Sequence, residues 1–254
     1  MGNRRRAGLS IFAKDHPLTG NLTASPWPAA YLFDLDGTLV DSLPDLAEAL
    51  DELLAEDGFA PLGAETVRGM IGHGVEKLVQ RGLAARGVVY ADAGLAEAVD
   101  RFRSLYEPRA ARLTRLYPGV EPVIAALRAG RVPMAVCTNK PEAPSHVILD
   151  QLGLTGWFGA VIGGDHGPPK KPAPDLVLAA AAALGVAPRD CLFVGDSGAD
   201  VGAARAAGVP VVVVRYGYTS VPAAELGADA VIDDFGGLAG VVADLAGRLT
   251  EPAR

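Results

Sequence analysis

Short apolar runs alternate with amphipathic stretches along most of the 254 residues of this chain. Continuous apolar runs are typical of parallel strands that are buried on both faces of a sheet. Such runs predict strands at Tyr31–Leu35, Pro133–Cys137, Ala160–Gly163, Cys191–Val194, Val209–Val214 and Ala230–Ile232. Helical spacing predicts helices at Gly119–Ala129, Glu142–Leu152, Asp175–Gly185, Ala199–Ala207 and Phe235–Arg248. The alternation indicates an α/β fold, a doubly wound parallel sheet of Rossmann-like type with helices on both faces.

Nearly a hundred residues separate the first predicted strand from the second, and this stretch contains no convincing strand. Apolar residues recur there with the i, i+3, i+4, i+7 spacing of a helix face, at Leu43, Leu46, Ala47, Leu50, Leu53 and Leu54. Further helical patterns cover Val67–Ile71, Val75–Arg86 and Leu95–Tyr106. We therefore predict an all-helical domain at residues 42–116, inserted into an α/β core made of residues 29–41 and 117–254.

Composition argues against a membrane protein and a nucleic-acid binder. Half of the residues are apolar, yet no window reaches the roughly 18 consecutive apolar residues that a membrane span needs. The net charge is −7, and an acidic protein is a poor partner for nucleic acid, whose phosphates attract Lys and Arg. Residues 1–28 are basic, with Arg4, Arg5, Arg6 and Lys14 against Asp15, and we expect them to form a disordered extension.

Cysteine usage favours a reducing compartment. Cys137 and Cys191 are the only cysteines, too few for a disulfide framework or a zinc site, and both lie inside apolar runs. We therefore expect two buried free thiols in a cytoplasmic protein. Both a monomer and a homodimer fit the sequence.

Carboxylates gather where two of the predicted strands end. The first strand runs into Asp34-Leu35-Asp36-Gly37-Thr38, and the fourth into Gly195-Asp196-Ser197-Gly198-Ala199-Asp200. Ligands of open α/β sheets bind at the carboxyl ends of strands, near the point where the strand order reverses. A strand order of 3-2-1-4-5 would make the first and fourth strands neighbours, so that Asp34, Asp36 and Asp196 converge.

Up to four carboxylates in one cleft would repel one another and an anionic substrate. A hard divalent cation removes this repulsion, and all-oxygen ligands favour Mg²⁺. A calcium loop of the EF-hand type needs ligands spread over twelve residues, and these do not follow here. A role as turn former or helix cap explains a single aspartate, but it does not explain three on two different strands.

Two other predicted strand ends carry groups that suit a phosphate. Thr138-Asn139-Lys140-Pro141 begins a helix, so that a hydroxyl and backbone N–H groups can face an anion. Lys171 precedes another helix and can present a point charge to phosphate oxygens, although Lys170 and Lys171 also fit an ordinary surface pair. The sequence has neither a P-loop nor a dinucleotide-binding fingerprint, which argues against kinases and dehydrogenases.

Together these segments resemble the four motifs of the haloacid dehalogenase superfamily of phosphohydrolases, in the same order. The matching segments are Asp34-x-Asp36-Gly37-Thr38, Thr138-Asn139, Lys171-Pro172 and Gly195-Asp196-Ser197-x-x-Asp200. The insert resembles the helical cap domain of the subclass typified by phosphoglycolate phosphatase. The segments Ile71-Gly72-His73-Gly74-Val75 and Tyr216-Gly217-Tyr218 are similar to that subclass as well.

The resemblance implies Mg²⁺-dependent hydrolysis of a small phosphate monoester, with 2-phosphoglycolate as the expected substrate. Asp34 would attack phosphorus and form an aspartyl-phosphate, and Asp36 would act as general acid and then as general base. Thr138 and Lys171 would complete the catalytic set by stabilising the transferring oxygens. The expected metal ligands are Asp34, Asp36 (through its backbone carbonyl), Asp196 and Asp200, and the expected phosphate-binding residues are Gly37, Thr138, Asn139 and Lys171.

Within the insert, His73 and Lys77 lie near the predicted start of a helix, and we expect one of them to bind a substrate carboxylate. A capped helix with ordinary surface cations fits the same residues. Other functions share the core motifs: a sugar-phosphate phosphatase, such as one for N-acetylmuramate 6-phosphate, and a β-phosphoglucomutase of this superfamily. A catalytically silent binding module is a further alternative, against which the complete set of motif residues argues.

Overall fold

The computed structural model of the protein describes residues 27–167 and 169–250. The basic extension predicted at residues 1–28 therefore lies outside the described residues, except for Trp27 and Pro28. Within the described ranges, no helix combines the length and the apolar character that a bilayer crossing requires.

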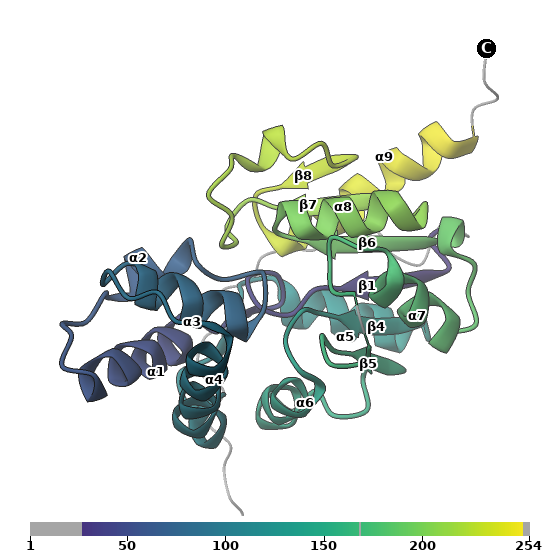
Figure 1. The fold of residues 1–254 in the computed structure, drawn as a ribbon. Helices are drawn as coiled ribbons and strands as arrows, with labels where there is room; N and C mark the ends of the chain where they lie inside the picture. Colours follow the sequence, from purple (N-terminus) through teal and green to yellow (C-terminus); the bar gives the residue numbers. More distant parts are fainter. Residues whose placement is uncertain (1–26, 168, 251–254) are drawn as a thin grey trace, which may run out of the picture.

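A six-stranded parallel sheet forms the centre of the molecule (Figure 1). Its strands are β1 (Ala30–Phe33), β4 (Met134–Cys137), β5 (Ala160–Ile162), β6 (Cys191–Gly195), β7 (Val211–Val214) and β8 (Ala230–Ile232). They lie in the order β5-β4-β1-β6-β7-β8, and every neighbouring pair is parallel. This is the predicted order 3-2-1-4-5 with β8 added at one edge, so the predicted fold class is confirmed.

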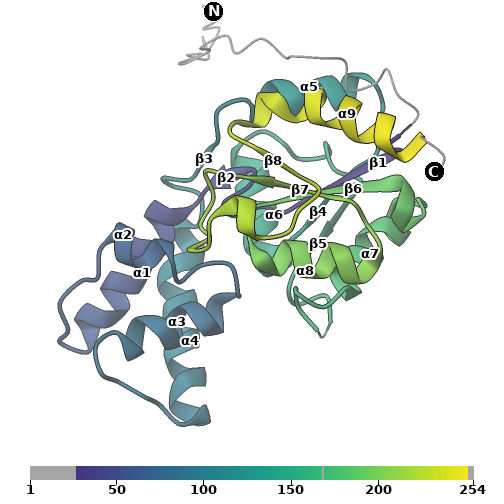
Figure 2. The ribbon, with the colours of Figure 1, turned by 90° about the horizontal axis from the view of Figure 1, so that it is seen from above.

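Helices cover both faces of the sheet, as Figure 2 shows for α5 and α9 on one face and α7 and α8 on the other. The core helices are α5 (Val120–Ala129), α6 (Glu142–Gln151), α7 (Asp175–Ala183), α8 (Gly198–Ala207) and α9 (Leu238–Thr250). Successive strand residues point to opposite faces. In β1, Tyr31 and Phe33 join the core beneath α5 and α9, whereas Ala30 and Leu32 join the core beneath α7 and α8. Burial on both faces explains why the four inner strands are unbroken apolar runs.

Four helices form a second unit beside the sheet (Figure 1). They are α1 (Leu43–Glu56), α2 (Ala64–Arg68), α3 (Val75–Ala84) and α4 (Asp92–Tyr106), and we call them the helical insert. The insert has its own apolar core, in which Leu50 and Leu53 of α1 pack with Leu83 of α3 and Phe102 of α4. The helix face read from the α1 sequence is the face that is buried here.

Two short strands connect the insert to the core. β2 (Val40–Asp41) and β3 (Arg115–Leu116) pair in antiparallel fashion, and we call this pair the connector. The expectation of no strand between the first two core strands was therefore wrong, because two-residue strands are too short to show a periodic pattern. The buried Asp45 carboxylate strengthens the connector by accepting hydrogen bonds from Leu113 N, Thr114 N and Thr114 Oγ1 at 2.8 to 3.0 Å.

Candidate active site

The tip of β1 presents Asp34. Its backbone N–H donates to the Val194 carbonyl in β6 at 2.9 Å, so the two strands end side by side. Its side chain is buried and accepts a hydrogen bond from Leu35 N at 2.8 Å. Gly37 follows with a φ of +86°, which favours glycine, and a Cβ there would lie 2.5 Å from Asp196 Oδ2. The glycine turn therefore allows the two aspartate-bearing loops to approach closely.

The tip of β6 presents Asp196, and the next helix presents Asp200. Asp196 directly follows β6, and its Oδ2 accepts a hydrogen bond from Tyr218 N at 2.6 Å. Asp200 lies in the first turn of α8, where its Oδ2 accepts from Ser197 N at 3.0 Å and from Ser197 Oγ at 2.6 Å. Asp200 is thus a helix cap as well as a member of the carboxylate cluster.

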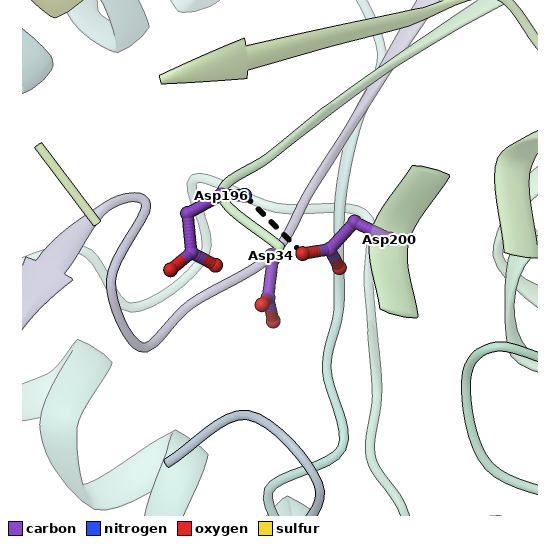
Figure 3. A group of neighbouring side chains, drawn as sticks. All are labelled: Asp34, Asp196 and Asp200. Atoms are coloured by element: carbon purple, nitrogen blue, oxygen red, sulfur yellow. Dashed lines mark hydrogen bonds between the residues drawn. The ribbon is translucent and has the colours of Figure 1, made fainter. Parts of the chain in front are cut away.

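Figure 3 shows the three carboxylates gathered at one place. One oxygen each from Asp34, Asp196 and Asp200 lies within 4.8 Å of the others. Burial raises the pKa of Asp34 to about 7, against the lowering effect of Lys171. Burial likewise raises the pKa of Asp196, and the charges of Asp200 and Asp34 add to the rise. Buried oxygen donors that resist ionisation in this way fit a hard divalent cation such as Mg²⁺, which would stabilise their charged forms.

Lys171 supplies a positive charge next to these aspartates. Its Nζ lies 2.6 Å from Asp200 Oδ1 and 3.0 Å from Asp34 Oδ1, and it donates to the Cys137 carbonyl at 2.9 Å. Burial would lower the pKa of Lys171, but the two carboxylates outweigh burial and raise it. In turn, Lys171 overcomes the burial of Asp200 and lowers the pKa of that carboxyl. The site therefore contains a stable ion pair in addition to two carboxyls with raised pKa values.

Thr138 and Asn139 extend the site at the end of β4. Both are buried, and Thr138 Oγ1 accepts a hydrogen bond from Lys140 N at 3.2 Å. Asn139 Oδ1 accepts from Lys171 N at 2.9 Å, while its Nδ2 donates to the Lys171 carbonyl at 3.1 Å and to the Gly72 carbonyl in the helical insert at 3.0 Å. The Asn139 side chain therefore holds Lys171 and the insert together, and a phosphate contact would fall to its backbone.

Asp36 has a separate set of partners. Its Oδ1 accepts a hydrogen bond from Ser42 Oγ at 2.6 Å, and Lys140 Nζ lies 3.1 Å from Oδ2. Lys140 Nζ also donates to the Tyr106 hydroxyl of α4 at 2.6 Å. None of the sequence motifs assigns a role to Ser42, Lys140 or Tyr106. Only the position of Lys140, directly after Thr138-Asn139, could have suggested one.

The helical insert faces the strand tips across a pocket of about 40 Å³. The pocket is lined by Asp34, Asp36, Thr138, Asn139 and Lys140 of the core and by Leu46, Ile71, Gly72, Gly74, Val75 and Leu78 of the insert. His73 is exposed and lines a neighbouring cleft, where Arg81 Nη1 lies 3.4 Å from His73 Nδ1. Burial and the Arg81 charge lower the pKa of His73. Lys77 is exposed, and its Nζ donates to Gln80 at 2.8 Å.

Tyr218 links the carboxylate cluster to the connector. Its hydroxyl accepts hydrogen bonds from Ser42 N at 2.8 Å and Leu43 N at 3.0 Å, and donates to Asp41 Oδ1 at 2.8 Å. A Cβ on the preceding Gly217 would clash with the Asp196 side chain, so glycine allows this loop to pass close to the cluster. The segment Tyr216-Gly217-Tyr218 is recognisable in the sequence, but its partners are not, because they are far away along the chain.

One protein-family model matches a stretch of the chain that contains all four motif segments. The model of the haloacid dehalogenase-like hydrolases matches residues 28–208, well over half of the chain. The chain belongs to the haloacid dehalogenase-like hydrolase family. The resemblance read from the four motifs is therefore confirmed.

The relatives of this haloacid dehalogenase-like hydrolase include several phosphatases. The chain is 46% identical over 215 residues to the phosphoglycolate phosphatase of Rhodospirillum rubrum, covering 83% of this chain and 89% of the relative. It is 44% identical to that of Caulobacter vibrioides, covering 82% and 87%. The crystal structure of a predicted phosphoglycolate phosphatase from Haemophilus somnus 129PT matches with a TM-score of 0.79 and 32% identity, over 86% of this chain and 99% of that one.

Proposed function

We propose that this hydrolase is a phosphatase that converts 2-phosphoglycolate into glycolate and inorganic phosphate, with Asp34 as the nucleophile. The observation that carries the proposal is the contact of Asp34 with Lys171 inside a cluster of three buried carboxylates at adjacent strand tips. The names of the relatives from Rhodospirillum rubrum and Caulobacter vibrioides support the choice of substrate.

The chemistry takes two displacements at phosphorus. Asp34 attacks phosphorus in line with the leaving oxygen, and an aspartyl-phosphate forms as the ester bond breaks. Asp36 gives its proton to the leaving alkoxide, which departs as glycolate. Asp36 then takes a proton from water while the water oxygen attacks the same phosphorus, which releases phosphate and restores Asp34. Ser42 and Lys140 hold the Asp36 carboxyl for both proton transfers.

Hydrogen-bond donors and cations must offset the negative charge on the oxygens of the phosphoryl group that is transferred. We assign this role to Lys171, the Thr138 hydroxyl and the Asn139 backbone, with the Gly37 turn leaving room for the phosphate. The residues that would hold Mg²⁺ are Asp34, Asp36 through its backbone carbonyl, Asp196 and, in support, Asp200. When bound, the ion would screen the nucleophile from its anionic substrate.

The pocket supports a small leaving group. Leu46, Ile71 and Val75 give its insert side an apolar wall. The hydroxyl groups of a sugar phosphate would lose hydrogen bonds to water against such a wall, at a cost of about 1–3 kcal/mol for each buried group. The sequence predicts His73 or Lys77 as the ligand of the substrate carboxylate, but His73 lines the neighbouring cleft and neither residue is among those that line this pocket.

The proposal is tested by measuring phosphate release with Mg²⁺ from 2-phosphoglycolate, N-acetylmuramate 6-phosphate, β-glucose 1-phosphate and p-nitrophenyl phosphate. We expect kcat/KM to be at least about tenfold higher for 2-phosphoglycolate than for the other esters. A higher value for a sugar phosphate would overturn the choice of substrate. Formation of glucose 6-phosphate instead of phosphate would favour a mutase, and binding without turnover would favour a silent binding module.

We also propose a cytoplasmic location, which the two buried free cysteines, Cys137 and Cys191, support. The partner is then a small phosphorylated metabolite. A monomer and a homodimer both fit this proposal, and sedimentation of the purified protein distinguishes them.

A further inference from the structure

Lys140 is a buried cation in the wall of the substrate pocket, and the reaction steps above use it only to hold Asp36. The residue is 6% exposed and lines the same pocket as Asp34 and Thr138. A buried ammonium is costly unless its charge and its N–H donors find partners. The partners of the Lys140 ammonium therefore decide what else it can bind.

The described contacts of the Lys140 ammonium involve two groups. The ammonium donates to the Tyr106 hydroxyl at 2.6 Å and to both Asp36 oxygens, Oδ2 at 3.1 Å and Oδ1 at 3.3 Å. An ammonium has three N–H donors. Because the two long bonds go to one carboxylate, a single donor can serve both Asp36 oxygens, which leaves Lys140 able to bind a further acceptor in the pocket.

The chemistry of the ester indicates what this acceptor is. Asp36 must reach the ester oxygen in order to protonate it. In the phosphate ester of a 2-hydroxy acid, the carboxylate is joined to the carbon that bears this oxygen. A carboxylate so close to the ester oxygen falls on the side of the pocket where Lys140 touches Asp36. The lining residues that the insert contributes, among them Leu46, Val75 and Leu78, carry no charge to offer it.

We propose that Lys140 binds the carboxylate of the leaving group and thereby selects phosphate esters of small 2-hydroxy acids over uncharged phosphate esters. This inference rests on the proposed function. Tyr106, which belongs to α4 of the helical insert, positions the Lys140 ammonium. Charge-assisted contact to a carboxylate is about twice as strong as a neutral hydrogen bond, so one lysine is enough to dominate selectivity.

The other cations near the pocket are placed less favourably. Lys77 is exposed and bonded to Gln80, and His73 lines the neighbouring cleft. The Lys171 ammonium already forms ion pairs with Asp200 and Asp34. Lys170 is exposed, although its ammonium lies beside Gly74 at the pocket, which makes it a matched control for Lys140.

The test compares kcat/KM for 2-phosphoglycolate and for ethyl phosphate, which has the same number of carbons and no carboxylate. In Lys140→Met we expect the ratio of the two values to fall at least about 30-fold, because the pairing of a buried carboxylate is lost. In Lys170→Met the ratio should stay within about twofold of wild type. A ratio that is unchanged in Lys140→Met, whether both values fall equally or neither falls, would show that Lys140 only positions Asp36 and overturn the inference.

Two further measurements keep the result interpretable. Lys140→Gln retains hydrogen-bond donors for Asp36 and Tyr106, so it should fold even where Lys140→Met does not, and the same fall in the ratio is expected. Calorimetry in an Asp34→Asn background should show weaker binding of 2-phosphoglycolate, and unchanged binding of ethyl phosphate, when Lys140→Gln is added.

Two outcomes would contradict the proposals. A fall in the kcat/KM ratio in Lys77→Met, but not in Lys140→Met, would assign the carboxylate to Lys77. A wild type without preference for 2-phosphoglycolate would contradict the proposed function itself.

Discussion

The two sides of the substrate pocket are built in different ways. On the core side, Lys171 is buried and bonded to Asp34 after β1, to the Cys137 carbonyl of β4 and to Asp200 in the first turn of α8. Next to the pocket on the insert side, His73 and Lys77 are exposed, and their side chains contact Arg81 and Gln80, which are three to eight residues away in the sequence. The core cation is therefore held by long-range contacts, whereas the side chains of these two insert residues contact residues nearby in the sequence.

This difference fits two demands on a phosphatase. Attack at phosphorus tolerates little displacement, and groups on rigid strand ends with several bonds each meet that demand. Exposed side chains on loops of a scaffold can vary more freely. Substitutions at the strand tips should therefore alter turnover or stability strongly, and substitutions on the exposed insert surface should alter them little.

The largest effect is expected from Asp34→Asn. We expect kcat to fall by at least about 10⁴-fold, because the amide cannot form the acyl phosphate. The midpoint of thermal unfolding without metal should stay the same or rise, because the buried carboxyl with its raised pKa is removed. Phosphate release and differential scanning fluorimetry measure the two quantities. Activity above about 1% of wild type would rule out Asp34 as the nucleophile.

Removal of Mg²⁺ should abolish turnover and make stability depend on pH. Burial raises the pKa of Asp34 from 3.8 to about 7, so the metal-free folded state binds this proton more tightly than the unfolded state. The resulting stabilisation is complete below about pH 4 and is lost as the pH rises through about 7. Mg²⁺ at a hundred times its Kd would add about 2.7 kcal/mol.

Thermal unfolding at pH 5 and pH 8, with EDTA and with Mg²⁺, checks this prediction. The ion should raise Tm more at pH 8, where the carboxyls that it would bind have lost their protons. An equal shift at both pH values would argue against a metal site made of Asp34 and Asp196.

A pair of substitutions in one loop should separate metal binding from positioning. Gly217→Ala would push the Asp196 side chain, so we expect the Mg²⁺ concentration for half-maximal activity to rise about tenfold. Tyr218→Phe keeps the backbone bond to Asp196 and loses the hydroxyl that binds Ser42 N and Leu43 N. It should lower kcat about tenfold at an unchanged Mg²⁺ requirement, since Ser42 in turn holds Asp36. Titration of the activity of both variants with Mg²⁺ measures these two quantities. If both variants raised the Mg²⁺ concentration for half-maximal activity by the same factor, the loop would act as one unit.

The smallest effect is expected on the outer surface of the helical insert. Arg103 Nη1 lies 3.3 Å from Asp100 Oδ1 on α4, and the two side chains are 48% and 75% exposed. Arg103→Ala should change the free energy of unfolding by less than about 0.5 kcal/mol, because water screens such pairs. Urea unfolding measures this change, and kcat should not move. A larger loss would mean that this face has a role that its exposure does not indicate.

Much of the core was predictable because its features are local in the sequence. The four inner strands are buried on both faces, and the edge strand Ala230–Ile232 was predicted at the limits that the structure has. The strand order then brings together any residue that directly follows a strand. Asp34 and Asp196 follow the neighbouring strands β1 and β6, and for this reason their convergence could be predicted from the chain alone.

Contacts between distant segments could not be predicted in this way. The Tyr218 hydroxyl meets the start of α1, and Lys140 meets Tyr106 of α4, although no periodic pattern relates these positions. The connector strands are two residues long, below the length at which alternation can be recognised. The sequence motifs therefore predicted which carboxylates lie together, whereas the contacts that hold their neighbours in place emerged only from the packing of the insert on the core.

The connector has a consequence for how such enzymes diversify. Asp45 ties the first turn of α1 to Leu113 and Thr114, so the chain leaves the sheet and returns to it at nearly the same point. The helical segment between these residues can therefore vary in sequence and length without altering the register of any core strand. Its variation is limited where Gly72 and Tyr106 contact Asn139 and Lys140 at the end of β4.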